Sequence, residues 1–158
     1  AYCGPHRLTD PLPGSTLTVG QALLSPTRTY APYVLRLLQA LGNQRVKGLV
    51  HCSGGGQTKC RRFGSKVHFI KDNLFPTPPI FAEIARVSGT DAKEMHQVYN
   101  MGHRLEVFVE PKDAEVALRL AAELGLGAQV IGRTEASTRP DGANHVTVIK
   151  DGQVLTYA

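Results

Sequence analysis

The 158-residue sequence contains no tryptophan, and it has only five tyrosines and five phenylalanines. Many proteins that bind single-stranded nucleic acid depend on aromatic side chains as stacking platforms between basic residues. Few aromatic residues lie among the basic residues here, and no recognised nucleic-acid-binding motif is present. We therefore expect no nucleic-acid partner.

Cysteines in a metal-binding spacing are also missing. The three cysteines are Cys3, Cys52 and Cys60, and no two of them form a C-x-x-C pair. An odd number without such a pair argues against a zinc site and against a disulfide framework, and it fits a reducing, cytoplasmic setting. Cys52 follows a histidine and is a candidate nucleophile, but we favour a buried structural thiol.

Long apolar runs and the common nucleotide-binding signatures are absent as well. No stretch is apolar for long enough to cross a bilayer, and no signal-peptide pattern is seen. Neither G-x-G-x-x-G nor a P-loop motif occurs, so neither of these nucleotide folds is indicated. We expect no membrane partner and no metal site. Because the sequence starts at Ala1 rather than at methionine, we expect a processed or cloned piece of a longer chain.

Charge is present but unevenly distributed. Residues 1–79 carry ten lysines and arginines against two acidic residues, whereas residues 80–158 carry eight against eleven. An excess of positive charge attracts anionic ligands. The first half is therefore the expected location of an anion site.

The most informative stretch lies in that basic half. Residues 46–51 read as a buried strand that ends in His51, and Cys52, Ser53 and the three glycines Gly54, Gly55 and Gly56 follow. A strand that leads into a glycine-rich loop can present backbone N–H groups to an anion, and glycine lets the backbone approach a phosphate closely. We predict an anion site here. A flexible loop beside a histidine at a strand end is the alternative.

Hydrophobic spacing predicts helices and strands that mix without strict alternation. Helices are expected at 17–24, 32–41, 79–88, 91–99 and 111–124, and strands at 46–51, 66–70, 104–110, 128–132, 145–150 and 153–157. Irregular polar loops are expected at 57–65 and 134–144. The pattern indicates an α+β fold, an α/β/α sandwich in which helices cover a mixed, partly ferredoxin-like sheet. Residues 1–16, rich in proline and glycine, read as a linker or arm before a domain at 17–158.

Several stretches, in this order, resemble the C-terminal domain of the aminoimidazole ribonucleotide synthetase (phosphoribosylformylglycinamidine cyclo-ligase) family. They are Leu17–Leu24, Pro26-Thr27-Arg28-Thr29-Tyr30, Lys47–Gly56, Pro79-Ile80-Phe81, Glu94-Met95, Tyr99-Asn100-Met101-Gly102 and Ile131-Gly132-Arg133. The sequence departs from the commoner pattern after Gly56, where Gln57–Phe63 replace an acidic-Asn-Ile-Pro-Arg segment. It departs again at His103 and Arg104. These differences indicate a divergent branch.

The resemblance implies ATP-dependent ring closure of formylglycinamidine ribonucleotide, a phosphorylated small molecule, with release of ADP and phosphate. It implies a catalytic role for His51, as a hydrogen-bond or proton donor, and substrate or phosphate binding by Ser53, Gly54, Gly55, Gly56, Arg28 and Asn100. In the family, an N-terminal domain that this chain lacks supplies most contacts to ATP and Mg²⁺. That domain is therefore an expected partner, and a homodimer is the expected assembly.

Three alternatives stay open at this point. One is a related ATP-dependent activity of the same superfamily, such as formylglycinamidine ribonucleotide synthase, thiamine-phosphate kinase, selenophosphate synthetase or a hydrogenase maturation factor. Another is a non-catalytic phosphate- or nucleotide-binding module. The third and weakest is a nucleic-acid binder that uses the basic half of the chain. Lys59, Arg62 and His103 have side chains that suit phosphate, but the matching family positions do not support them. His6, His68, His96 and His145 are expected to be surface or core residues.

Overall fold

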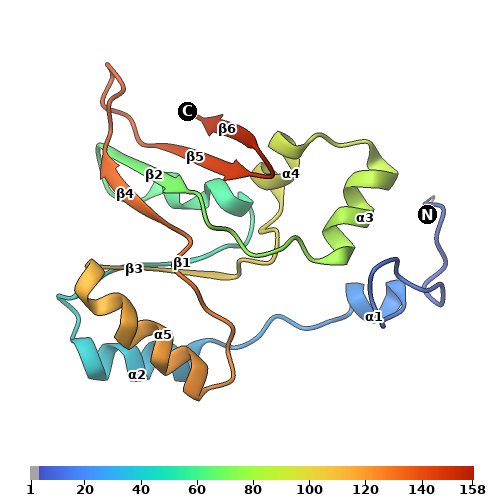
Figure 1. The fold of residues 1–158 in the computed structure, drawn as a ribbon, viewed down its shortest axis with the longest axis horizontal. Helices are drawn as coiled ribbons and strands as arrows, with labels where there is room; N and C mark the ends of the chain where they lie inside the picture. The colour runs from blue at the N-terminus through green and yellow to red at the C-terminus, as the bar shows by residue number, and fades with distance from the viewer. Residues whose placement is uncertain (1–3) are drawn as a thin grey trace.

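The computed structural model describes residues 4–158, so Cys3 lies outside the described residues. Figure 1 shows a four-stranded sheet, a separate pair of strands below it, and two helices that cover the pair from the other side. The elements, in chain order, are α1 (Val19–Leu23), α2 (Ala31–Leu41), β1 (Val46–His51), the 3₁₀ helix η1 (Gly56–Arg62), β2 (Val67–Lys71), α3 (Pro79–Ser88), α4 (Ala92–Val98), β3 (Leu105–Val109), the 3₁₀ turn η2 (Pro111–Asp113), α5 (Ala114–Glu123), β4 (Gly132–Ala136), β5 (His145–Lys150) and β6 (Gln153–Tyr157). The predicted α+β class is confirmed.

The lower core joins α2 and α5 to the antiparallel pair β1–β3. Helix α2 has Pro32 in its first turn, where a missing N–H costs nothing, and it ends at Gly42, whose φ is +74°. Its buried side chains Tyr33, Leu37 and Leu41 pack against the apolar face of α5 and against partly buried residues of β1 and β3. The apolar spacing of both helices thus explains why they lie on the same face of the pair.

The upper core belongs to the four-stranded sheet, whose order is β4-β2-β5-β6. Strand β2 runs parallel to β5 and antiparallel to β4, so the sheet is mixed. The hairpin β5–β6 turns at Asp151 and Gly152, both at positive φ, as the Asp-Gly pair predicts. Cys52, which directly follows β1, and Cys60, from η1, are both buried in this core. The chain after β1 therefore links the two cores.

Two sequence predictions about local structure are wrong. Residues 128–131 form no strand. The strand instead begins at Gly132, the last residue of the predicted strand, and runs to Ala136, into the segment expected as the polar loop 134–144. Strand β4 is an edge strand with largely exposed side chains, so it lacks the apolar signal of a buried strand. The segment expected as the irregular loop 57–65 largely forms η1, whose buried Gln57, Thr58 and Cys60 pack inward.

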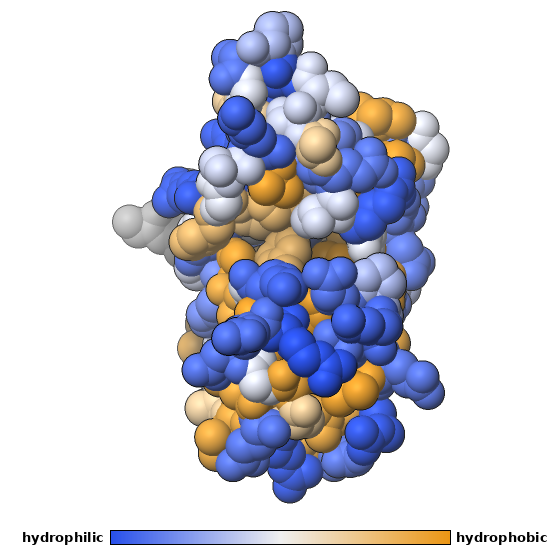
Figure 2. Space-filling view, turned by 90° about the vertical axis from the view of Figure 1, so that its left-hand side faces the viewer, coloured by the Kyte–Doolittle hydropathy of each residue, from blue (hydrophilic) through white to orange (hydrophobic). Residues whose placement is uncertain are grey.

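The space-filling view shows apolar side chains in a hollow between the upper part of the molecule, which holds the four-stranded sheet, and the lower part, which holds α2 and α5 (Figure 2). Before α1, Leu12 is buried and Pro11 bridges to Thr18, so the described part of the expected arm contacts the body of the chain. Within residues 4–158, none of the helices has both the length and the apolar character that a membrane crossing needs.

Candidate functional site

The site predicted from the sequence is the turn Ser53–Gly56, which we call the glycine turn. It connects β1 to η1. The Ser53 N–H donates to the carbonyl of His51 (2.9 Å), and the Gly56 N–H donates back to the carbonyl of Ser53 (3.1 Å). Gly55 and Gly56 have φ of +96° and +47°, in the left-handed region that favours glycine. The turn is thus a tight, hydrogen-bonded reversal and not a slack loop.

The three glycines meet different surroundings. A Cβ on Gly56 would lie 2.3 Å from the carbonyl oxygen of Tyr99 and 2.8 Å from that of His96, so close packing excludes a side chain. Gly55 needs glycine for its positive φ. Gly54 has no positive φ, and nothing lies within 4 Å of the position its Cβ would take. Only Gly54 therefore has open space above it and no structural need for glycine.

Backbone donors are available on this open side. Within residues 4–158, the N–H groups of Gly54 and Gly55 donate to no acceptor, although their neighbours on both sides are paired. Two consecutive free N–H groups in a turn form a concavity that suits an anion. The geometry therefore fits the predicted anion site.

Two side chains border the turn. His51 ends β1 and is exposed. Lys59, on η1, donates from Nζ to Oγ of Ser53 at 2.5 Å, and it pairs with no carboxylate in the part of the chain that the structure describes. The sequence analysis gave Lys59 no role because the matching family positions do not support one, and it expected residues 57–65 to be an irregular loop. The helical turn of η1 brings this ammonium group to Ser53.

The other two predicted binding residues lie in different places. Arg28 is exposed, and its Nη1 donates to the carbonyl of Gly125 beyond α5 (3.3 Å), so no contact ties it to the glycine turn. Asn100 lies next to the turn. Its Nδ2 donates to the carbonyl of Cys52 (3.3 Å), and its Oδ1 accepts from the N–H of Gly102 (2.9 Å). Asn100 thus holds the chain just before the turn.

The expected surface or core histidines make contacts of that kind. His6 contacts Glu83 at 2.5 Å, His68 stacks on the buried His145 with ring centroids 3.8 Å apart, and the His96 ring is buried within α4. They leave His51 as the exposed histidine at the turn.

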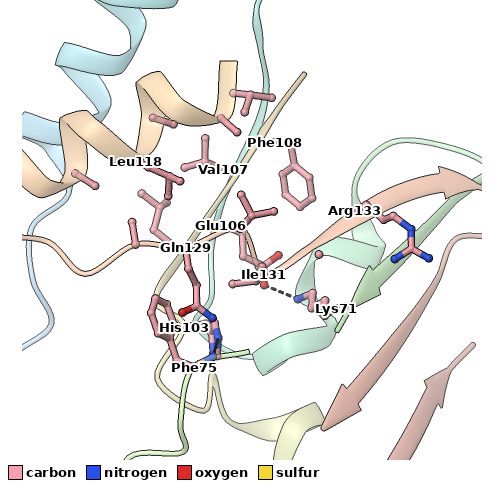
Figure 3. Close-up of a pocket in the computed structure, with 18 of the residues that line it drawn as sticks. Lys71, Phe75, His103, Glu106, Val107, Phe108, Leu118, Gln129, Ile131 and Arg133 are labelled. Atoms are coloured by element: carbon pink, nitrogen blue, oxygen red, sulfur yellow. Dashed lines mark hydrogen bonds and ion pairs between the residues drawn. The ribbon is translucent and has the colours of Figure 1, made fainter. Parts of the chain in front are cut away.

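Below the turn, an ion pair is buried inside the protein. Lys71, at the end of β2, pairs with Glu106 of β3, and both side chains are at most 4% exposed (Figure 3). Lys71 Nζ also donates to the carbonyl of Gln57 (2.6 Å) and to its Oε1 (3.2 Å). Burial lowers the pKa of Lys71, but the Glu106 carboxylate, together with the nearby Cys60 and Cys52, raises the pKa overall, so the ammonium stays charged.

The thiol of Cys52 belongs to the same buried region. Its Sγ donates to Oε1 of Glu106 at 3.3 Å. Burial, and then the negative charge of Glu106, raises the pKa of the thiol well above its usual range. A thiol is nucleophilic only as the thiolate. Cys52 is therefore the buried structural thiol expected from the sequence and not a nucleophile.

A cavity of about 690 Å³ opens on the other side of this ion pair, between β3 and residues 126–134. Its walls are mostly apolar, and Lys71, Glu106 and His103 are among its polar residues (Figure 3). His103 Nε2 accepts the N–H of Phe75 (3.1 Å), and burial, followed by the charge of Lys71, lowers its pKa to about 4. No residue of the glycine turn lines this cavity.

Comparisons with known proteins agree with the sequence resemblance. The family described as "AIR synthase related protein, C-terminal domain" matches residues 9–143. Similar curated proteins include two named phosphoribosylformylglycinamidine cyclo-ligase. The one from Methanocaldococcus jannaschii is 38% identical over 79% of this chain and 35% of its own length, and the one from Myxococcus xanthus is 38% identical over 73% and 33%. The chain therefore spans about a third of the length of these relatives, and it belongs to the AIR synthase related family as its C-terminal domain.

Proposed function

We propose that this chain is the C-terminal domain of an ATP-dependent cyclo-ligase that closes formylglycinamidine ribonucleotide to aminoimidazole ribonucleotide. The names of the relatives support this, as does the family to which the chain belongs. One observation supports placing the phosphate-binding site at the glycine turn. The N–H groups of Gly54 and Gly55 are free, and the exposed His51 lies just before them in the chain.

In the proposed reaction, the formyl oxygen of the substrate attacks the γ-phosphorus of ATP, and ADP leaves. The amidine nitrogen then attacks the activated carbon, the carbon–oxygen bond to phosphate breaks, and the nitrogen loses a proton. Such steps need donors aimed at phosphoryl oxygens more than they need covalent help from the protein. The N–H groups of Gly54 and Gly55, with Lys59 and Ser53, supply these donors. His51 donates a hydrogen bond or proton to the oxygen that is phosphorylated.

Among residues 4–158, no three His, Cys, Asp or Glu side chains lie close enough together to hold the Mg²⁺ that the family implies. No step is assigned to a metal here. Its ligands would come from the N-terminal domain that the family resemblance implies.

The anion site can be tested on the 158-residue chain itself. Inorganic phosphate should shift the amide NMR signals of Gly54 and Gly55 first, because their N–H groups are free. Shifts confined to the half-buried Arg61 and the exposed Arg62 would instead indicate non-specific charge attraction and would contradict the proposed site.

The catalytic assignment is tested by His51→Ala in the longer polypeptide, in a cyclisation assay with formylglycinamidine ribonucleotide and ATP. We expect kcat/KM to fall roughly 10²–10⁴-fold, and His51→Asn to recover part of it if hydrogen bonding matters more than proton transfer. Stability should change by less than about 1 kcal/mol, because the exposed side chain leaves no cavity. Lys47→Ala, on the same strand, is the control.

Normal turnover by His51→Ala, together with a large loss of stability, would end the catalytic assignment. Phosphate binding without cyclisation by the intact polypeptide would favour the non-catalytic binding module. Turnover of ATP with a different acceptor would favour a related activity of the same superfamily.

A further inference from the structure

Hydrogen bonds from the protein interior fix the chain at both ends of the glycine turn. Cys52 precedes the turn and Gln57 follows it, and both residues are at most 2% exposed. Asn100 bonds to both sides, since its Nδ2 donates to the Cys52 carbonyl and its own carbonyl accepts from Gln57 Nε2. One residue of the break after α4 therefore fixes the distance between the two ends of the turn.

The ion pair below completes a closed circuit. Glu106 accepts from the Cys52 thiol, and Lys71 bonds to Glu106 and to the carbonyl and side chain of Gln57. The bonds thus run from Cys52 through Glu106, Lys71, Gln57 and Asn100 back to Cys52. We call these five residues the buried network. It draws on β2, β3, η1 and the segment after α4, so elements of both cores meet under the turn.

Stability alone does not account for this arrangement. A buried ion pair is weak evidence for stability, because desolvation offsets much of the attraction, and well-packed apolar residues of similar volume often serve equally well. What the Lys71–Glu106 pair adds, compared with apolar side chains, is a hydrogen-bond donor held in a fixed direction. Lys71 directs its ammonium to the carbonyl of Gln57, and an apolar side chain cannot do so.

The carbonyl of Gln57 matters because it belongs to the first turn of η1, immediately after Gly56. Holding it fixes the peptide plane at the exit of the turn, and the Cys52 bonds fix the entrance. Hydrogen-bond donors assist phosphoryl chemistry only when they already point at the reacting oxygens.

We infer that Lys71 and Glu106 are positioning residues, which act through Gln57 and Cys52 to keep the N–H groups of Gly54 and Gly55 aimed at an anion. This inference rests on the proposed function for the identity of the anion, but not for the mechanical role of the network.

The decisive variant is Lys71→Met/Glu106→Leu, which removes both charges and leaves no uncompensated one. Its melting temperature should stay close to that of the unmodified chain. Amide hydrogen exchange should nevertheless speed up about tenfold or more at Gly56 and Thr58, whose N–H groups close the turn, relative to amides of β5. The dissociation constant for inorganic phosphate should rise several-fold, because the donors are no longer preorganised.

The matched control is Arg45→Met/Asp113→Leu, which removes another ion pair with a fully buried carboxylate, away from the turn. It should leave the relative exchange rate at Gly56 and Thr58 unchanged. If the first double variant does not fold, Gln57→Met keeps the ion pair and breaks the circuit at one member. It should raise exchange at the same two amides by a smaller factor.

The outcomes separate the two proposals. Unchanged exchange at Gly56 and Thr58 in a folded network variant, or an equal rise in the control, would overturn the positioning role while leaving the anion site standing. Faster exchange in the network variant alone supports the positioning role. If phosphate then shifts no amide of the turn in the unmodified chain, the anion site fails and the positioning role does not.

Discussion

Gly54 and Gly56 are two residues apart in one motif, yet the structure treats them in opposite ways. Above Gly54 nothing lies within 4 Å of the missing side chain, whereas at Gly56 the carbonyls of Tyr99 and His96 fill that space. The backbone donor of Gly54 is free, and that of Gly56 is bonded inside the turn. Glycine at position 54 thus leaves the backbone N–H groups accessible, whereas glycine at position 56 allows close packing.

This difference extends to the surroundings. Exposed His51 precedes the turn and the ammonium of Lys59 bonds to Ser53, while the buried network and its ion pair lie beneath the turn. A site that must bind an anion and keep its donors rigid needs both sides. The comparison predicts that a substitution that disturbs close packing below the turn, as at Gly56, lowers stability, whereas a substitution on the open side changes binding with little change in stability.

The largest effect is expected for Gly56→Ala. The new Cβ would clash with Tyr99 at 2.3 Å, and alanine is strained at a φ of +47°, so the free energy of unfolding should fall by about 3–5 kcal/mol. Urea denaturation measures it. Gly89→Ala is the control, because Gly89 also has a positive φ, +68°, but nothing within 4 Å. It should cost only about 1–2 kcal/mol. Equal losses in both variants would refute packing as the reason for Gly56.

The next effect concerns acid stability on the underside. Burial, and then the charge of Lys71, lowers the pKa of His103 from 6.5 to about 4. Between these two values the His103 ring stays neutral in the native state, whereas in the unfolded chain it takes up a proton. Stability is therefore lost as the pH falls from 6.5 towards 4, by about 2–3 kcal/mol between pH 7 and pH 4.5. Urea midpoints at these two pH values measure the loss.

His103→Gln is the variant that checks this prediction. Glutamine can still accept the N–H of Phe75, but it does not titrate, so the loss between pH 7 and pH 4.5 should shrink to a small remainder. The low pKa of Glu83, about 2, affects stability only below its unfolded value of 4.5, outside this range. A full pH dependence in the variant would show that another group is responsible.

The two sides of the turn also differ in what the sequence could predict. The strand that ends at His51, and the glycines after it, were recognised because local pattern and family resemblance agree there. The hairpin at Asp151 and Gly152 was predicted for the same local reason. The anion role of these residues stays a prediction.

The underside was not predictable in this way. Lys71 and Glu106 lie 35 positions apart, and each falls in a segment where a charged residue normally faces solvent. No spacing rule joins them, because their contact depends on how β2 and β3 meet below the turn. Strand β4 was missed for a related reason, since an exposed edge strand is defined by its pairing partner and not by its own apolar residues.

The smallest change in stability is expected for Gly54→Ala, and this variant tests the open side most directly. Gly54 has no positive φ and no neighbour within 4 Å of a new Cβ, so the free energy of unfolding should change by less than about 0.5 kcal/mol. The methyl group would, however, occupy the space from which an anion reaches the free N–H groups. Because a hydrogen bond to a charged group contributes about 1.5–3 kcal/mol, phosphate affinity should fall roughly tenfold or more.

Gly127→Ala, which is equally unobstructed but remote from the turn, should change neither quantity. Phosphate titrations followed by amide NMR measure the affinity, and undiminished binding by Gly54→Ala would place the anion elsewhere on the basic half of the chain.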